Sequence, residues 1–246
     1  MAELMTPEFW LAVGQIILID IVLGGDNAVV IALACRQLPP AQRTKGILWG
    51  TAGAIVLRVI LIFFALTLLA IPYLKLVGAV LLLWIGVKLL LPEDGDAHAN
   101  IQGSDRLWGA VKTVIIADLV MSLDNVIAIA GAAEAAGSAS KMPLVIFGLL
   151  VSIPIIVWGS QLALKLMDRF PIIITLGGML LGWIAGTMAV GDPAVTPYLP
   201  TVETNAHVEP VAWLRYGAGV AGALLVLAVG KMVAARAKAR GAVTSH

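Results

Sequence analysis

Long apolar stretches dominate the sequence, and short polar or proline-containing segments separate them. Seven stretches hold about 20 mostly apolar residues, the length of a helix that crosses a bilayer. They are residues 9–34, 46–71, 73–91, 107–133, 144–166, 171–190 and 211–234. The alternation of polar and apolar residues expected in a membrane barrel is absent. The pattern predicts an all-α polytopic membrane protein with seven transmembrane helices.

Composition narrows the class of protein further. Of 246 residues, 60% are hydrophobic and 13% are charged, whereas soluble domains are about 45–50% apolar and about 25% charged. This excludes a soluble enzyme, and the hydrophobicity excludes a disordered chain. The formal net charge of +1 argues against binding to nucleic acid, which requires a basic face. The single cysteine, Cys35, cannot form an internal disulfide.

The positive charges predict the orientation of the chain. Twelve Lys and Arg residues fall on one side of the predicted membrane and three on the other, the three being Lys75, Lys141 and Arg215. Because positive charge collects in cytoplasmic loops, the N-terminus is expected outside and the C-terminus in the cytoplasm. Glu3 and Glu8 precede the first stretch without any Lys or Arg, so we interpret it as a retained helix and not as a cleaved signal.

The sequence contains an internal repeat. The segment Asp20-Ile-Val-Leu-Gly-Gly-Asp26-Asn27 returns 98 positions later as Asp118-Leu-Val-Met-Ser-Leu-Asp124-Asn125. Shorter matches follow in the same order in the next two apolar stretches of each half. We therefore predict one transmembrane domain with repeats over 9–91 and 107–190, an unpaired seventh helix at 211–234, a cytoplasmic loop at 92–106 and an external loop at 191–210.

Each repeat has three spans, so the second runs through the membrane in the opposite direction to the first. Inverted repeats of this kind are typical of secondary transporters, which bind their substrate near the midplane where the repeats meet.

The four repeated aspartates, Asp20, Asp26, Asp118 and Asp124, lie inside the predicted membrane. Each opposes insertion by at least about 2.5–3.5 kcal/mol. Arg58, in the middle of the second stretch, offers one positive charge against four negative ones. Protonation, water or a bound cation must supply the rest.

Helix geometry limits how these groups converge. At about 100° per residue, Asp20 and Asp26 lie about 120° apart, while Asp20 and Asn27 share one face. Two arrangements are compatible with this: local unwinding at Gly24-Gly25, or one site that takes oxygens from both repeats. We favour the shared site, with unwinding as a supplementary hypothesis.

The ligand chemistry indicates a hard divalent cation. Carboxylates and the amides of Asn27 and Asn125 suit Mg²⁺, Ca²⁺ and Mn²⁺. The three histidines fall in predicted loops or the tail, so we expect no imidazole ligand in the membrane. The thioether of Met121 favours Mn²⁺ if it faces the ion, although packing is the commoner role of a buried Met.

The paired motifs on a seven-span chain resemble the TerC family of integral membrane proteins, within the wider LysE transporter superfamily, and in particular its short, YjbE-like branch. The resemblance covers residues 10–190. It implies a bacterial inner (cell) membrane location and a role in exporting Mn²⁺ from the cytoplasm, and the family name refers to tellurium resistance. Carried over by motif, the metal-binding residues are Asp20, Asp26, Asn27, Asp118, Asp124 and Asn125.

Other interpretations stay open at this point. The aspartates could be structural, or they could belong to an intramembrane aspartyl protease, although the Gly-x-Gly-Asp signature of that enzyme class is missing. Arg58 is either a charge partner that relieves repulsion when the metal leaves or a fixed ion-pair partner. The acidic loop around Glu93 is either a solvated connector or a surface that collects cations.

We therefore predict a non-enzymatic divalent cation exporter, most simply coupled to protons, with Mn²⁺ as its substrate. No permanently bound cofactor and no nucleic-acid partner are expected. A Ca²⁺ or other cation/proton exchanger and a tellurium-resistance component are the alternatives. The sequence does not determine the oligomeric state.

Overall fold

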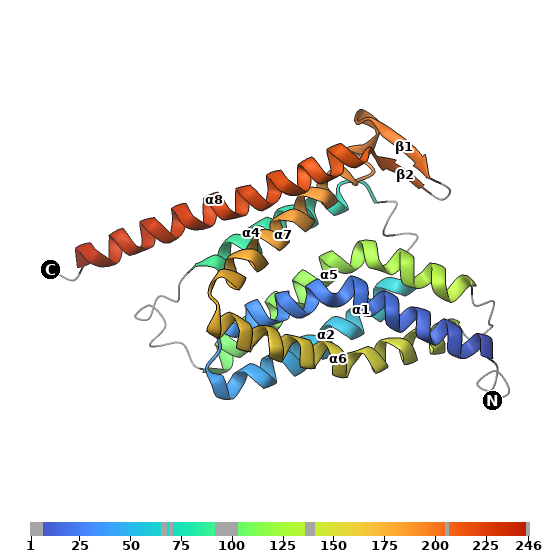
Figure 1. Ribbon diagram of the computed structural model, residues 1–246, viewed down its shortest axis with the longest axis horizontal. Coiled ribbons are helices and arrows are strands. Elements are labelled where there is room, and N and C mark those ends of the chain that lie inside the picture. Colours follow the sequence, from blue (N-terminus) through green and yellow to red (C-terminus); the bar gives the residue numbers. More distant parts are fainter. Residues whose placement is uncertain are drawn as a thin grey trace. The chain divides into compact units, whose positions relative to one another are not determined.

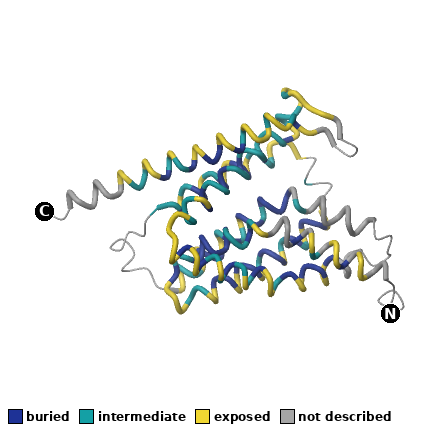
Figure 2. The backbone as a smooth tube through the Cα atoms, viewed as in Figure 1, coloured by how far each residue is buried: buried dark blue, intermediate teal, exposed yellow. Residues whose placement is uncertain are grey.

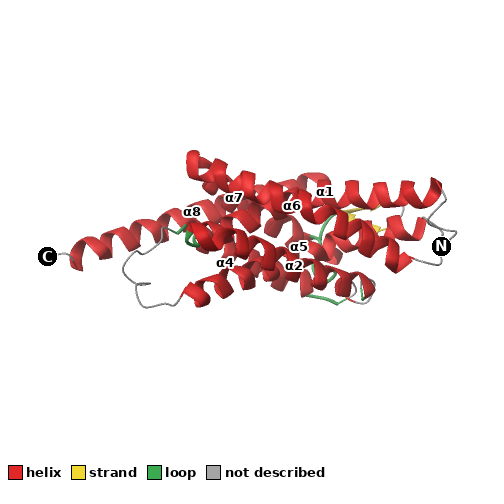
Figure 3. Cartoon of the chain, turned by 90° about the horizontal axis from the view of Figure 1, so that it is seen from below, coloured by secondary structure: helices red, strands yellow, loops and turns green. Residues whose placement is uncertain are grey.

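The computed structural model describes residues 7–64, 68, 71–91, 103–135, 141–204 and 207–244. Helices account for most of these residues (Figures 1 and 3). Their bounds are α1 (Pro7–Arg36), α2 (Pro40–Phe63), α4 (Leu74–Leu90), α5 (Gly103–Ala135), α6 (Lys141–Arg169), α7 (Ile172–Val190) and α8 (Ala212–Thr244). A 3₁₀ turn at Thr196–Tyr198 precedes two short strands, β1 (Thr201–Thr204) and β2 (His207–Pro210).

The chain divides into two compact units. Unit 1 comprises Met1–Leu69 and Ser104–Lys165, and unit 2 comprises Ala70–Gly103 and Leu166–His246. Unit 1 therefore contains α1, α2, α5 and most of α6, the first two helices of each sequence repeat. Unit 2 contains α4 and α7, the third helix of each repeat, together with α8. Both units thus combine helices from both halves of the sequence, and we describe each by itself.

In unit 1, contacts fix the directions of the helices. A Cβ atom built on Gly46 of α2 would lie 3.0 Å from Cys35 Sγ of α1, and Arg58 further along α2 bonds Asp20 further back in α1, so these helices are antiparallel. On α5, the neighbours of Gly46, Gly50 and Arg58 are Leu107, Val114 and Ser122, so α2 and α5 are parallel. It follows that α5 runs opposite to α1.

Glycines allow α2 to pack closely against α5. A Cβ atom on Gly50 would lie 2.9 Å from Val114 Cγ1, and one on Gly53 would lie 2.5 Å from Ile115 Cδ1. Small residues at such positions let helix backbones approach in membrane proteins. The close packing of α2 on α5 brings the Arg58 side chain within reach of α5 two turns later.

In unit 2, α4, α7 and α8 pack through glycine. A Cβ atom on Gly186 of α7 would lie 2.6 Å from the carbonyl carbon of Ala218, and one on Gly219 of α8 would lie 2.8 Å from the Trp183 ring. A Cβ atom on Gly86 of α4 would lie 3.3 Å from the Gly178 carbonyl oxygen. Any larger side chain at the α7–α8 positions would push the two backbones apart.

A buried aspartate joins the end of α7 to the start of α4. Asp192 is fully buried, and its carboxylate accepts the backbone N–H groups of Tyr73 at 2.9 Å, Leu76 at 3.1 Å and Ala194 at 2.7 Å. Tyr73 has a φ of 67°, which is unfavourable for a residue other than glycine. The carboxylate therefore caps a helix whose first residue needs an external acceptor.

The segment predicted as the external loop contains an unpredicted hairpin. Strands β1 and β2 pair antiparallel, with Val202 opposite Glu209 and Thr204 opposite His207. The sequence predicts a loop there, but the β-branched Thr and Val residues between its prolines favour strands. The hairpin is the main departure from the predicted all-α fold among the described residues.

The helix bounds otherwise follow the apolar stretches, with differences at the ends. Helix α2 begins at Pro40, six residues before the predicted start, because proline is well suited to the first helical turn. Helix α5 begins at Gly103 where 107 was predicted. Most of the predicted cytoplasmic loop at 92–106, including Glu93, lies outside the described residues.

Large apolar side chains are exposed along the helices, and Figure 2 shows exposed positions recurring along α6 and α8. Trp49, Val56 and Trp158 are 66%, 62% and 66% exposed. Among the described residues, four helical segments are long and apolar enough to cross a membrane: Pro40–Phe63, Val145–Arg169, Ile172–Val190 and Ala212–Arg236. The chain is therefore a multi-pass membrane protein, while the count of seven spans and the inverted-repeat architecture stay predictions.

Candidate functional site

The centre of unit 1 holds a charge cluster built around one arginine. Arg58 Nη1 of α2 bonds Asp20 Oδ1 of α1, and Arg58 Nη2 bonds Asp118 Oδ1 of α5 at 2.5 Å. The third nitrogen, Nε, donates to the Ser122 hydroxyl at 3.1 Å, and that hydroxyl donates to Asp118 Oδ2 at 3.1 Å. Every nitrogen of the guanidinium thus has an acceptor.

The cluster is deeply buried and carries more negative than positive charge. Arg58 and Asp20 are 2% exposed and Asp118 is 4% exposed. With both carboxylates ionised, two negative charges face one positive charge. Arg58 is the one buried Lys or Arg among the side chains that the structure describes, so no second such cation balances the pair within this part of the chain. Such charge is costly in an apolar protein interior unless a proton or a bound cation compensates it.

The two carboxylates occupy equivalent places in the sequence repeat, but their surroundings differ. Asp20 and Asp118 are 98 positions apart, as are Gly24 and Ser122. Only the second copy of the motif therefore carries a hydroxyl one helical turn after its carboxylate. At the repeat position of Arg58 stands Ile156, which is buried, so the central cation comes from the first repeat alone.

Asn27 lies on the same face of α1 as Asp20 and is the least satisfied polar side chain of the predicted site. It is 2% exposed, and neither its Oδ1 nor its Nδ2 has a hydrogen-bond partner among the described residues. Asp20 Oδ2 is also without a partner there. Buried polar groups of proteins are nearly always bonded, so these atoms indicate a place for water or a ligand.

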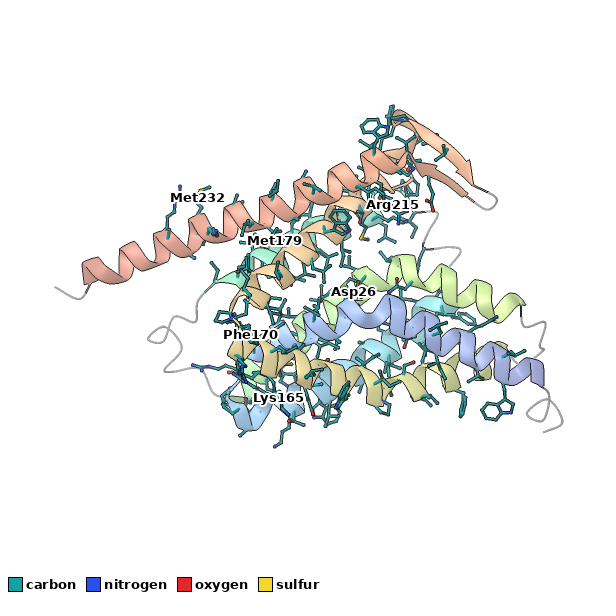
Figure 4. All side chains as sticks on the ribbon, viewed as in Figure 1. Asp26, Lys165, Phe170, Met179, Arg215 and Met232 are labelled. Carbon is teal, nitrogen blue, oxygen red and sulfur yellow. The ribbon has the colours of Figure 1, made fainter. Side chains whose placement is uncertain are left out.

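Asp26 lies on a different face of α1 from Asp20, as helix geometry predicts. It is half-buried, Figure 4 labels it on α1, and its Oδ1 accepts the N–H of Asn27 at 2.8 Å. Helix α1 is continuous through Gly24 and Gly25, so the hypothesis of local unwinding there is wrong for this structure. Asp20 and Asp26 accordingly do not aim at one point.

Asn27 and Asn125 lie on opposite sides of the charge cluster. Each follows its aspartate, Asp20 or Asp118, by seven residues, which is about 10.5 Å along a helix. Because α1 and α5 run in opposite directions and both aspartates meet at Arg58, the two asparagines diverge from it. The structure therefore joins Asp20 to Asp118, keeps Asp26 within electrostatic range of Arg58 and Asp118, and places Asn27 and Asn125 at different levels of the two helices. The side chain of Asp124 lies outside the described residues.

The described side chains do not form a ready-made metal centre. No three His, Cys, Asp or Glu residues among them gather around one point. The carboxylates that do meet, Asp20 and Asp118, already share Arg58. A cation at this cluster would therefore take oxygens from Asp20 Oδ2 and Asn27, from water, or from carboxylate oxygens that Arg58 has left.

Sequence reasoning missed two polar residues that the structure makes important. Ser122, which stands where the first repeat has Gly24, connects Arg58 to Asp118. Asp192, in the predicted external loop, caps α4. Ser122 could have been found from helix geometry, since it follows Asp118 by one helical turn, whereas the Asp192 contact spans 119 positions and leaves no local pattern.

A helical exterior of large apolar side chains around a buried, charged centre defines a multi-pass integral membrane protein. The family model for the integral membrane protein TerC family matches residues 5–238. The chain belongs to this family.

Several bacterial membrane proteins are similar to the chain. YjbE of Bacillus subtilis (strain 168) is 41% identical over 213 residues, which cover 85% of this chain and 94% of YjbE. YceF of the same organism is 26% identical over 196 residues, covering 76% of this chain and 74% of YceF. The inner membrane protein YoaE of Escherichia coli (strain K12) is 26% identical over 195 residues, or 72% of this chain and 36% of YoaE. No solved structure matches the chain.

Proposed function

We propose that the protein exports a divalent cation, Mn²⁺ in the first place, from the bacterial cytoplasm in exchange for protons. The observation that supports this most directly is the Asp20–Arg58–Asp118 cluster, in which two buried carboxylates share one guanidinium. A cluster that only held helices together would not need the second carboxylate. In a membrane interior, ionisable groups of this kind mark ion pathways and proton relays.

The oxygen chemistry supports a hard cation. Asp20 Oδ2 and Asn27 Oδ1 are buried acceptors without partners among the described residues, and carboxylate and amide oxygens are typical ligands of Mg²⁺, Ca²⁺ and Mn²⁺. Family membership places the chain among integral membrane proteins. The choice of Mn²⁺ follows from the resemblance to family members implicated in its export, and so does membership of the wider LysE superfamily.

Energetics favour a coupled mechanism. Moving two positive charges outward against an inside-negative potential costs about 4.6 kcal/mol per 100 mV. The same carboxylates can release a divalent cation when they take up protons, so proton antiport is the simplest coupling. In alternating access, the inverted repeats would expose the acidic residues to one side at a time.

Whole-cell metal content tests the proposal. Cells that express the chain under Mn²⁺ load should contain less manganese than cells with an empty vector. Lower calcium with unchanged manganese would make Ca²⁺ the substrate in place of Mn²⁺, and the protein would still be a divalent cation exporter. Tellurite tolerance with unchanged manganese, calcium and magnesium would overturn the exporter.

Reconstituted protein tests the coupling. In proteoliposomes, Mn²⁺ flux should increase with an imposed pH gradient and should change the lumenal pH. Mn²⁺ flux that neither responds to the gradient nor moves protons would contradict antiport while leaving export in place.

A further inference from the structure

We propose that Arg58 is a tethered counter-cation, which occupies the Asp20–Asp118 pair between transport events and which the transported cation must displace. This inference rests on the proposed function and adds a positioning residue to it. The guanidinium bonds both carboxylates and Ser122 at once. It therefore occupies the centre of unit 1, where helices of the two sequence repeats meet.

The charges make the exchange reversible. With Arg58 bound, the two carboxylates keep one net negative charge, which attracts a cation. With a divalent ion at Asp20 and Arg58 still bonded to Asp118, each carboxylate has a counter-charge, and the cluster with its ion carries one net positive charge. Neither state leaves both carboxylates without a counter-charge in the interior, where an unpaired charge is costly. A pair with no tethered cation would instead hold a divalent ion strongly and release it slowly.

Unpaired acceptors lead to Arg58 from one side only, as far as the described residues show. Helices α1 and α2 are antiparallel, and the Arg58–Asp20 contact fixes their register. Thr51 precedes Arg58 by seven residues and Asn27 follows Asp20 by seven, so Thr51 of α2 lies at the level of Asn27 of α1. The Thr51 hydroxyl is buried and has no hydrogen-bond partner among the described residues. Asp20 Oδ2, Asn27 Oδ1 and Thr51 Oγ1 are therefore successive oxygens that Arg58 does not use.

This column of acceptors lies toward the turn between α1 and α2, the side predicted to face the cytoplasm. An entering cation would meet Asn27, Thr51 and the half-buried Asp26 first and would then compete with Arg58 for Asp20. The Nη1 contact to Asp20 is therefore expected to break before the Nη2 and Nε contacts to Asp118 and Ser122. Arg58 can turn toward α5 on its long side chain while it keeps those two partners.

Binding of Mn²⁺ to the purified full-length chain tests the inference, with transport measured on the same preparations. Arg58→Gln should bind Mn²⁺ at least tenfold more tightly than wild type, because the internal competitor is gone, and should transport it at least tenfold more slowly, because release is impeded. Arg58→Lys, which keeps the charge with fewer hydrogen bonds, should fall between the two. Arg215→Gln removes an exposed ion pair with Glu209 and should match wild type.

A charge-matched variant separates competition from net charge. Arg58→Gln combined with Asp118→Asn restores one net negative charge and should bring the Mn²⁺ affinity part of the way back to wild type. Should Arg58→Gln fail to fold, the affinity of Arg58→Lys decides: an affinity equal to that of wild type overturns the inference.

Two outcomes distinguish the failure of this inference from the failure of the proposed function. A wild-type chain that binds and transports none of Mn²⁺, Ca²⁺ and Mg²⁺ overturns both. A wild-type chain that transports Mn²⁺, beside a folded Arg58→Gln variant with unchanged or weaker Mn²⁺ affinity, overturns this inference alone and makes Arg58 a structural link between α1, α2 and α5.

Discussion

Asp20 and Asp118, 98 positions apart in the sequence, bond the same guanidinium. The first aspartates of the two motif copies thus meet in a single charge cluster, whereas the two asparagines lie on opposite sides of it. The stability of the unit and its proposed transport function depend on the same three charged side chains.

Neutralising either shared carboxylate should abolish export. In Asp20→Asn or Asp118→Asn, the cluster keeps its shape but loses its net negative charge, so it no longer attracts a cation. Manganese content under Mn²⁺ load should rise to that of cells with an empty vector, while the variants still insert into the membrane.

The same loss of export is expected for Asp26→Asn and Asp124→Asn from the sequence repeat. Asp105→Asn, an exposed change in the first turn of α5, serves as the control, and wild-type manganese levels in all four variants would refute the assignment.

Asn27→Leu should separate stability from function. Asn27 is a buried amide without partners among the described residues, and an unsatisfied buried group of this kind costs about 1–3 kcal/mol. An apolar side chain of similar size should therefore leave the melting temperature unchanged or raise it, while Mn²⁺ transport is lost. Ser160→Ala removes a buried hydroxyl that bonds the Ile156 carbonyl of its own helix and should keep transport. An Asn27→Leu variant with a lower melting temperature and normal Mn²⁺ transport would contradict this prediction.

Gly50→Leu should disrupt the charge cluster from a distance. Its side chain would collide with Val114 and push α2 from α5, which carry Arg58 and Asp118. Overpacking of this kind costs about 1–3 kcal/mol, so both the melting temperature and Mn²⁺ transport should fall.

Two matched variants check that the Gly50 effect is local. A Cβ atom on Gly109 meets nothing within 4 Å, so Gly109→Leu should resemble wild type. Val114→Ala should restore part of the stability lost in Gly50→Ala, because it removes the two Cγ atoms of Val114, one of which is the nearest atom to the new Cβ. Gly50→Leu with wild-type melting and transport would show that the approach of α2 to α5 is not required.

Asp192→Ala should destabilise unit 2 without changing transport by the protein that stays folded. Three backbone N–H groups lose a charged acceptor, and one hydrogen bond to a charged group is worth about 1.5–3 kcal/mol. Asp192→Asn keeps one acceptor oxygen and should lose less. Glu209→Gln, at an exposed ion pair, should melt like wild type. If Asp192→Ala melted like wild type as well, the helix cap would contribute nothing.

The sequence predicts much of this arrangement, and physical reasons explain what it misses. Apolar length alone predicts the helices, and helix periodicity predicts that Asp20 and Asn27 share a face while Asp26 does not. The repeat indicates that Asp20 and Asp118 are equivalent, but not that they meet at Arg58, because that contact depends on how closely α2 approaches α5. The cap by Asp192 depends on the meeting of chain segments distant in sequence, which no local pattern encodes.

The glycine contacts of α7 and α8 have a mechanical consequence. Where backbone lies directly against backbone, no side chain remains between the two helices to change rotamer and absorb a displacement. The pair can slide along its line of contact, but it cannot be compressed where backbone meets backbone. Helices α7 and α8 should therefore keep one common spacing throughout any working cycle of the protein, and the Trp183 ring on Gly219 is a side chain at their seam that can still rearrange.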